Sequence, residues 1–129
     1  MTRFVLSLVL IAHLSSVCAA SFAERVATAK EIESQKEADT YFKNRMFPAI
    51  GSLLGNAMKA CTALPYANLE KFAVVADVTQ TGKFINIDYQ PRTNTAACVA
   101  EAVTGFYAPP PPTCESGDLP IVIEMSVVP

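Results

Sequence analysis

The tract KFAVVADVTQTGKFINIDYQP, at residues 71–91, constrains the fold more strongly than any other segment of the chain. Two runs rich in β-branched and aromatic residues flank a turn that contains a glycine, which is the sequence pattern of a β-hairpin. In the first run the residues of one face are apolar, namely Phe72, Val74, Ala76 and Val78. Asp77 and Thr79 alternate onto the other face. We therefore expect an antiparallel sheet built around this hairpin.

The second run of the hairpin begins out of phase with the apolar residues that follow it, because Phe84 has the opposite parity. If residues 79–82 form a type I turn with a left-handed glycine, Val78 faces Phe84. A bulge near Ile85 and Asn86 then returns the later apolar residues to the core side. The register of the hairpin is thus a specific prediction.

Helices are predicted before the hairpin. Residues 21–45 hold strong helix formers and no Gly or Pro, which indicates a surface helix or, alternatively, a helix that binds a partner. Between Pro48 and Pro65, apolar side chains follow helical spacing and define one buried face, made of Ile50, Leu53, Leu54, Ala57, Met58 and Cys61.

After the hairpin, TNTAACVAEAV predicts a short helix whose N-cap is Thr93, Asn94 or Thr95. LPIVIEMSVVP then alternates as a half-buried strand. Between them stands the proline run of GFYAPPPPTC, at residues 105–114, which is interpreted as a stiff connection from helix to strand, with a polyproline ligand as the alternative. The order of elements is helix, helix, strand, strand, helix, strand.

The first residues, MTRFVLSLVLIAHLSSVCAASFA, are typical of a cleavable secretory signal. Their apolar run is about a dozen residues, shorter than the roughly 20 that span a bilayer. We expect removal of residues 1–20, with cleavage after Ala23 as the alternative. Cys18 allows a lipoprotein signal, but Val17 occupies the position that usually carries a small residue. The predicted division is a signal at 1–20, an N-terminal helical extension at 21–45 and an α+β domain at 46–129.

Several functions are excluded by residues that the processed chain lacks. Cleavage removes His13, the only histidine, and with it the Ser-His-Asp and Cys-His nucleophile systems and imidazole metal ligands. Nine basic and twelve acidic residues remain, which leaves no basic patch for nucleic acid. The glycines form no phosphate-binding motif. We expect no catalytic residues, no cofactor and no metal.

Three cysteines remain in a chain expected to enter an oxidising compartment. Cys61 and Cys98 lie on or beside the apolar faces of two predicted helices, so they can meet if the helices pack side by side. We predict this disulfide, with Cys98 to Cys114 as the competing pair. Cys114 is then a free or intermolecular thiol.

Asp77 and Asp88 lie on facing predicted strands and raise the question of an acid/base pair. Such chemistry needs burial or mutual repulsion to move one pKa towards neutrality. Because both alternate with core residues, we expect them to face water instead.

The tract from Phe72 to Val128 resembles the C-terminal domains of TonB- and TolA-like envelope proteins, in the subset with a cysteine on each helix. The matching motifs, in order, are ADVTQTGKF, IDY, AACVAEAV, FYAPPPP and PIVIEMSVV. The resemblance implies an α+β domain with a three-stranded antiparallel sheet and helices on one face. It also implies docking of a partner at an exposed sheet edge.

Together these features predict a non-enzymatic interaction module of the bacterial cell envelope, periplasmic or secreted, whose partner is an envelope protein or peptide. The retained anchor and proline-rich spacer of TonB itself have no counterpart here, so energy transduction by this chain alone is not expected. The alternatives are a small secreted enzyme or inhibitor that uses carboxylates or a free thiol, and a disulfide-linked structural homodimer.

Overall fold

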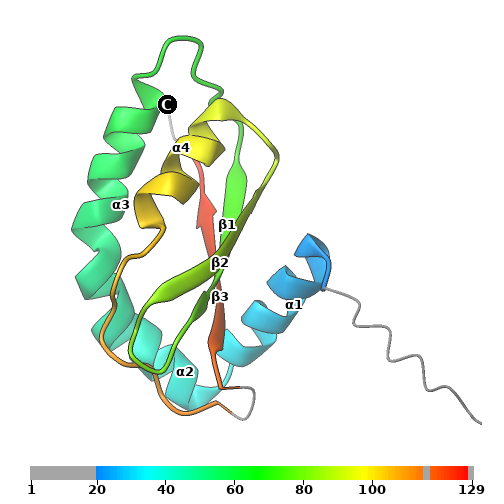
Figure 1. Ribbon diagram of the computed structural model, residues 1–129, viewed down its shortest axis with the longest axis vertical. Coiled ribbons are helices and arrows are strands. Elements are labelled where there is room, and N and C mark those ends of the chain that lie inside the picture. The colour runs from blue at the N-terminus through cyan, green and yellow to red at the C-terminus, as the bar shows by residue number, and fades with distance from the viewer. Residues whose placement is uncertain (1–19, 115–116, 128–129) are drawn as a thin grey trace, which may run out of the picture.

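The computed structural model describes residues 20–114 and 117–127. Its elements are α1 (Phe22–Glu33), α2 (Lys36–Tyr41), the π-helical segment η1 (Phe42–Met46), α3 (Phe47–Thr62), β1 (Phe72–Val78), β2 (Phe84–Gln90), α4 (Asn94–Val103) and β3 (Leu119–Met125). The strands form one antiparallel sheet in the order β2-β1-β3 (Figure 1). The predicted α+β class and three-stranded sheet are therefore confirmed. Apart from Ala20, the predicted signal peptide lies outside the described residues.

The hairpin register is as predicted. Val78 pairs with Phe84, and the Gly82 N–H donates to the Thr79 carbonyl oxygen at 2.8 Å, with Gly82 at a φ of 93°. The register then shifts, since Asn86 and Ile87 lie opposite the single residue Ala76. This is the predicted bulge, and Asn86 adopts a φ of 53° within it. The bulge brings the second half of β2 back against the hydrophobic core.

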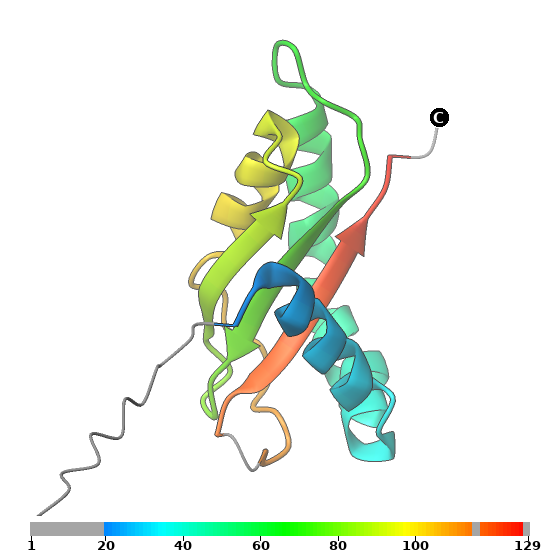
Figure 2. The same ribbon diagram turned by 90° about the vertical axis from the view of Figure 1, so that its right-hand side faces the viewer.

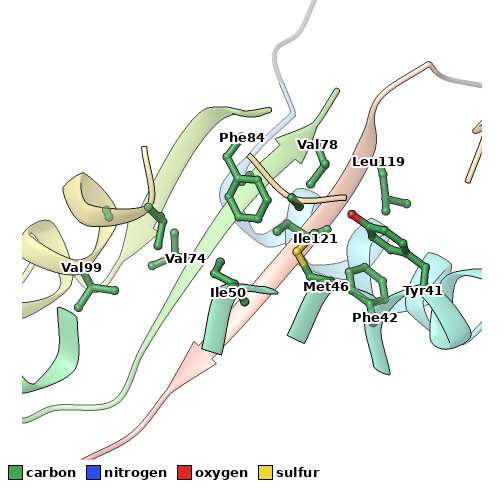
Figure 3. Packing of buried hydrophobic residues seen from close by; sticks show 14 of the residues in the cluster. Tyr41, Phe42, Met46, Ile50, Val74, Val78, Phe84, Val99, Leu119 and Ile121 are labelled. Carbon is green, nitrogen blue, oxygen red and sulfur yellow. The ribbon is translucent and has the colours of Figure 1, made fainter. Parts of the chain in front are cut away.

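Helices α3 and α4 cover one face of the sheet and enclose most of the core (Figures 1 and 3). Helix α4 begins at an N-cap, Thr93, whose hydroxyl accepts from the Ala96 N–H at 3.1 Å. The largest fully buried side chains come from the three strands and from α3 and α4, among them Phe84, Ile50, Leu119, Val74, Val75, Val78, Val99 and Val103. Figure 3 shows Tyr41, Phe42 and Met46 packed beside the strands.

The opposite face of the sheet carries α1, which differs from the expectation that all helices share one face (Figure 2). Ala29 and Val75 are each only 1% exposed. The small Ala29 side chain lets the helix approach closely, and Val75 makes the central strand apolar on both faces. Two ion pairs flank this contact, one from Lys30 to Glu124 at 2.7 Å and one from Arg25 to Asp77 at 3.8 Å.

The helix predicted over residues 21–45 is split. Helix α1 ends at Glu33, and its C-cap Ser34 begins a short turn before α2. From α2 the chain continues through η1 directly into α3. The π-helical segment ends two residues before Pro48, whose missing N–H would interrupt a regular α-helix. The second half of the predicted extension thus supplies core residues, among them Tyr41 and Phe42.

Candidate functional site

The two outer edges of the sheet differ, and the first part of the β2 edge is occupied. After α4 the chain runs beside the start of β2, where the Phe84 N–H donates to the Phe106 carbonyl oxygen at 2.9 Å. The Ala108 N–H donates to the Gly82 carbonyl oxygen at 2.8 Å. Further along, the Arg25 guanidinium donates to the Asn86 carbonyl oxygen at 2.6 Å. The bulge and these bonds protect the first part of this edge, up to Asn86, from further pairing.

The outer edge of β3 is open. This strand pairs with β1 from Leu119 to Met125, without a register shift. Within residues 20–114 and 117–127, no other segment hydrogen-bonds to its backbone. The alternate N–H and C=O groups that point away from β1 are therefore available to an added strand.

A shallow groove of about 200 Å³ accompanies the open edge, lined by Lys30, Glu33, Phe47, Val122, Ile123 and Glu124. Helix α1 supplies one wall and the first turn of α3 the other. The Phe47 side chain is 49% exposed, and its ring lies 6.1 Å from that of the buried Phe42. The groove thus combines backbone groups with an apolar contact for a side chain, which are the requirements of strand addition.

The rim of the groove is charged. Lys30 donates to the Glu124 carboxylate at 2.7 Å, and this hydrogen bond, aided by the charges of Lys30 and Lys71, lowers the pKa of Glu124. Glu33 adds a second carboxylate to the lining. Because these groups remain accessible, they can favour one direction or composition of a bound peptide.

Asp77 and Asp88 are not brought together by the fold. The register pairs Asp77 with Ile85 and Asp88 with Val75. The expectation that both face water holds in part: the Asp77 side chain is 25% exposed, lies beside Arg25 of α1 and accepts from the Asn86 side chain at 2.9 Å. Asp88 forms an ion pair with Arg92 at 2.8 Å.

The predicted disulfide between Cys61 and Cys98 is present, with Cα atoms 5.6 Å apart. The competing pair, Cys98 with Cys114, is therefore wrong: α3 and α4 pack side by side and bring the first two cysteines together. Cys114 is a free thiol that packs against the core, and burial raises its pKa. A raised pKa lowers the thiolate fraction and with it the reactivity.

The proline run packs into the structure. The Tyr41 hydroxyl donates to the Pro109 carbonyl oxygen at 2.7 Å, and Ala108 and Pro111 are buried. These contacts favour the interpretation as a stiff connection over that as a free polyproline ligand. Among the described residues, no group of three or more His, Cys, Asp or Glu side chains is placed to hold a metal ion.

Two surface features were not predicted from the sequence. Phe47 precedes the helical pattern that starts at Pro48, so nothing in the spacing marks it as half-exposed. In the loop at residues 63–71 the sequence pattern shows only the end of a helix at Pro65, although Tyr66 is 99% exposed. A proline followed by a bulky residue between two elements was the available signal.

No protein-family model, curated protein or solved structure matches this chain. The resemblance to TonB- and TolA-like domains stays a prediction from the sequence motifs named above. Within the described part of the chain, no helix is both long enough and apolar enough to cross a membrane.

Proposed function

We propose that this protein is a non-enzymatic interaction module of the bacterial cell envelope that binds an extended segment of a partner protein at the outer edge of β3. The observation that carries the proposal is the difference between the two sheet edges: described residues hydrogen-bond to the backbone at the first part of the β2 edge, and none does so along the outer β3 edge. Strand addition needs only the backbone groups of that edge and the groove beside it.

A bound strand gains from both parts of the site. Its main chain pairs with β3, which supplies affinity without dependence on side-chain identity. Its alternate side chains lie over Phe47 and Ile123, which favours an apolar or aromatic residue there. The charged rim formed by Lys30, Glu33 and Glu124 then selects among sequences.

A periplasmic or secreted location is part of the proposal. The disulfide between Cys61 and Cys98 is typical of proteins outside the cytoplasm. The N-terminal sequence is typical of an export signal. The similarity to TonB- and TolA-like domains is consistent with that compartment.

The alternative of a secreted enzyme or inhibitor would use the carboxylates of Asp77 and Asp88 or the Cys114 thiol, and the surroundings of these groups do not favour it. Asp77 is paired with Arg25 and Asp88 with Arg92. The Cys114 thiol, which also carries the alternative of a covalent dimer, has its pKa raised by burial.

Site-specific photo-crosslinking in the host cell tests the proposal. A photoreactive phenylalanine analogue at position 47 is expected to give a discrete adduct with a partner chain. The matched control is the same analogue at Tyr107, which is 61% exposed beside the covered β2 edge. Adducts of equal yield from both positions, or none from position 47, would contradict docking at β3.

A further inference from the structure

The loop at residues 63–71 presents apolar side chains at one end of the molecule. It links α3 to β1 and projects beyond the neighbouring helices and strands in both views (Figures 1 and 2). Leu64 is 38% exposed, Tyr66 99% and Leu69 55%. These are three of the five large hydrophobic residues that are exposed in the described part of the chain. The loop is therefore a convex apolar tip, and we name it the Tyr66 loop.

The Tyr66 loop is held in place by one side chain. The Asn94 amide nitrogen donates to the Tyr66 carbonyl oxygen at 3.0 Å, and the Asn94 amide oxygen accepts from the Asn68 N–H at 3.0 Å. Asn94 opens α4, which the disulfide at Cys98 ties to the end of α3. The apolar tip is thus preorganised, so little ordering is needed when it makes contact.

Tyr66 has an unfavourable conformation for its residue type. The Ala67 N–H donates to the Leu64 carbonyl oxygen at 3.1 Å and closes a β-turn with Pro65 in its second position. Tyr66, in the third position, has a φ of 58°, where Gly or Asn is preferred. Because the Tyr66 ring is exposed, no burial of the side chain offsets this strain. A strained backbone conformation that no contact within the fold compensates points to a role in binding.

Basic residues flank the Tyr66 loop. Lys59 and Lys71 are exposed, and neither ammonium forms an ion pair within the described residues. Glu70 is the only carboxylate between them, so residues 59–71 have an excess of one positive charge. The whole chain, by contrast, has a net charge of −2. The apolar tip therefore lies between two exposed lysines in an acidic protein, and Lys71 also lies near Glu124.

We propose that the Tyr66 loop makes a reversible contact with an anionic lipid surface. Leu64 and Leu69 enter the boundary between headgroups and acyl chains, and the Tyr66 hydroxyl lies at headgroup level, as interfacial tyrosines do. Lys59 and Lys71 face the anionic headgroups. This contact is separate from the β3 edge and does not depend on strand addition there.

A single-tryptophan variant tests the contact directly, because the chain contains no Trp. Tyr66→Trp is mixed with vesicles of phosphatidylethanolamine and phosphatidylglycerol, and its emission is expected to shift to the blue and to be quenched by brominated acyl chains. Tyr107→Trp is the matched control and is expected to show neither change. Equal responses at both positions, or none at position 66, would overturn the proposal.

Tyr66→Asn gives a second, independent measurement. Asn tolerates a positive φ, so the variant is expected to fold while its vesicle partition coefficient falls roughly tenfold or more. Raising the salt concentration is expected to weaken binding of the unaltered protein as well, because the lysines are screened. The N-terminal residues are the same in both proteins, so the difference reports the loop. An unchanged partition coefficient would contradict the proposal, and so would a lipid-free dimer that Tyr66→Asn dissociates.

Discussion

At the scale of single residues, Gly82 must lack a Cβ atom. Both the turn and the contact between the β2 edge and Ala108 depend on this. Its φ is 93°, and a Cβ atom would lie 1.9 Å from the Ala108 carbonyl oxygen. Gly82→Ala is expected to lower the free energy of unfolding by more than about 1 kcal/mol, since both the backbone conformation and the space forbid a side chain. Urea denaturation measures the change.

Gly51→Ala is the matched control for that substitution. Gly51 lies in α3, and a Cβ atom there would meet nothing within 4 Å. The same change is expected to stabilise the protein by about 0.5–1 kcal/mol through the higher helix propensity of Ala. If both glycine variants shifted stability in the same direction, the role assigned to Gly82 would be wrong.

Tyr41 gives a prediction about alkaline pH. Burial raises its pKa from 10.0 to about 12, although the positive charge of Arg45 acts to lower it. Because the unfolded chain ionises this phenol at lower pH, its contribution to stability is complete below pH 10 and is lost as the pH rises to about 12. Tyrosinate absorbance should show one late titration step, which Tyr41→Phe removes. That variant also loses the hydrogen bond to Pro109, at a cost of about 1 kcal/mol in unfolding free energy.

At the scale of elements, the hairpin was predictable from the sequence and the position of α1 was not. Alternation and one glycine determine the hairpin register locally, including the bulge at Asn86. Helix α1 has a weak apolar stripe, so its periodicity does not indicate which surface it covers. Val75 was the available signal, because a buried face behind the hairpin requires a cover. The disulfide was predictable, since the spacing of Cys61 and Cys98 placed both near facing helix surfaces.

Ala29→Glu tests whether α1 is an integral layer. A carboxylate at this buried position, against the sheet, is expected to detach α1 and to cost roughly 2–4 kcal/mol. Hydrogen exchange should show faster exchange of the α1 amides. Ala27→Glu, on the exposed side of the same helix, is the control and is expected to change stability by less than about 0.5 kcal/mol. Equal effects of the two substitutions would argue against the packing of α1.

The disulfide between α3 and α4 is expected to make a large contribution to the free energy of unfolding. Replacing Cys61 and Cys98 together by Ser should lower the unfolding free energy by about 4 kcal/mol, because the bond closes a loop of 37 residues. Cys114→Ser is the control and is expected to cause a much smaller loss. Denaturation of the three proteins with and without reductant separates these cases, and non-reducing electrophoresis reports any dimer formed through Cys114.

At the scale of the whole molecule, the sheet is covered on both faces and on the first part of one edge. Helices α3 and α4 lie on one face, α1 lies on the other, and residues 106–108 follow the β2 edge. Sequence patterns predict well which face of a strand is buried, because side chains alternate along it. They predict poorly which edge of a sheet is covered. The bonds along β2 join backbone groups of segments distant in the sequence, so no side chain marks them. The open β3 edge was therefore predictable only through the family resemblance, and only as an edge of unspecified identity.

The partial cover of the β2 edge has a consequence for assembly. A sheet with two free edges can accept a strand on either side, and successive additions then propagate into a fibre. Here the Phe106 and Ala108 backbone groups occupy the start of the β2 edge. If a partner strand adds at β3 as proposed, we therefore expect one bound segment per molecule and no growth into a fibre.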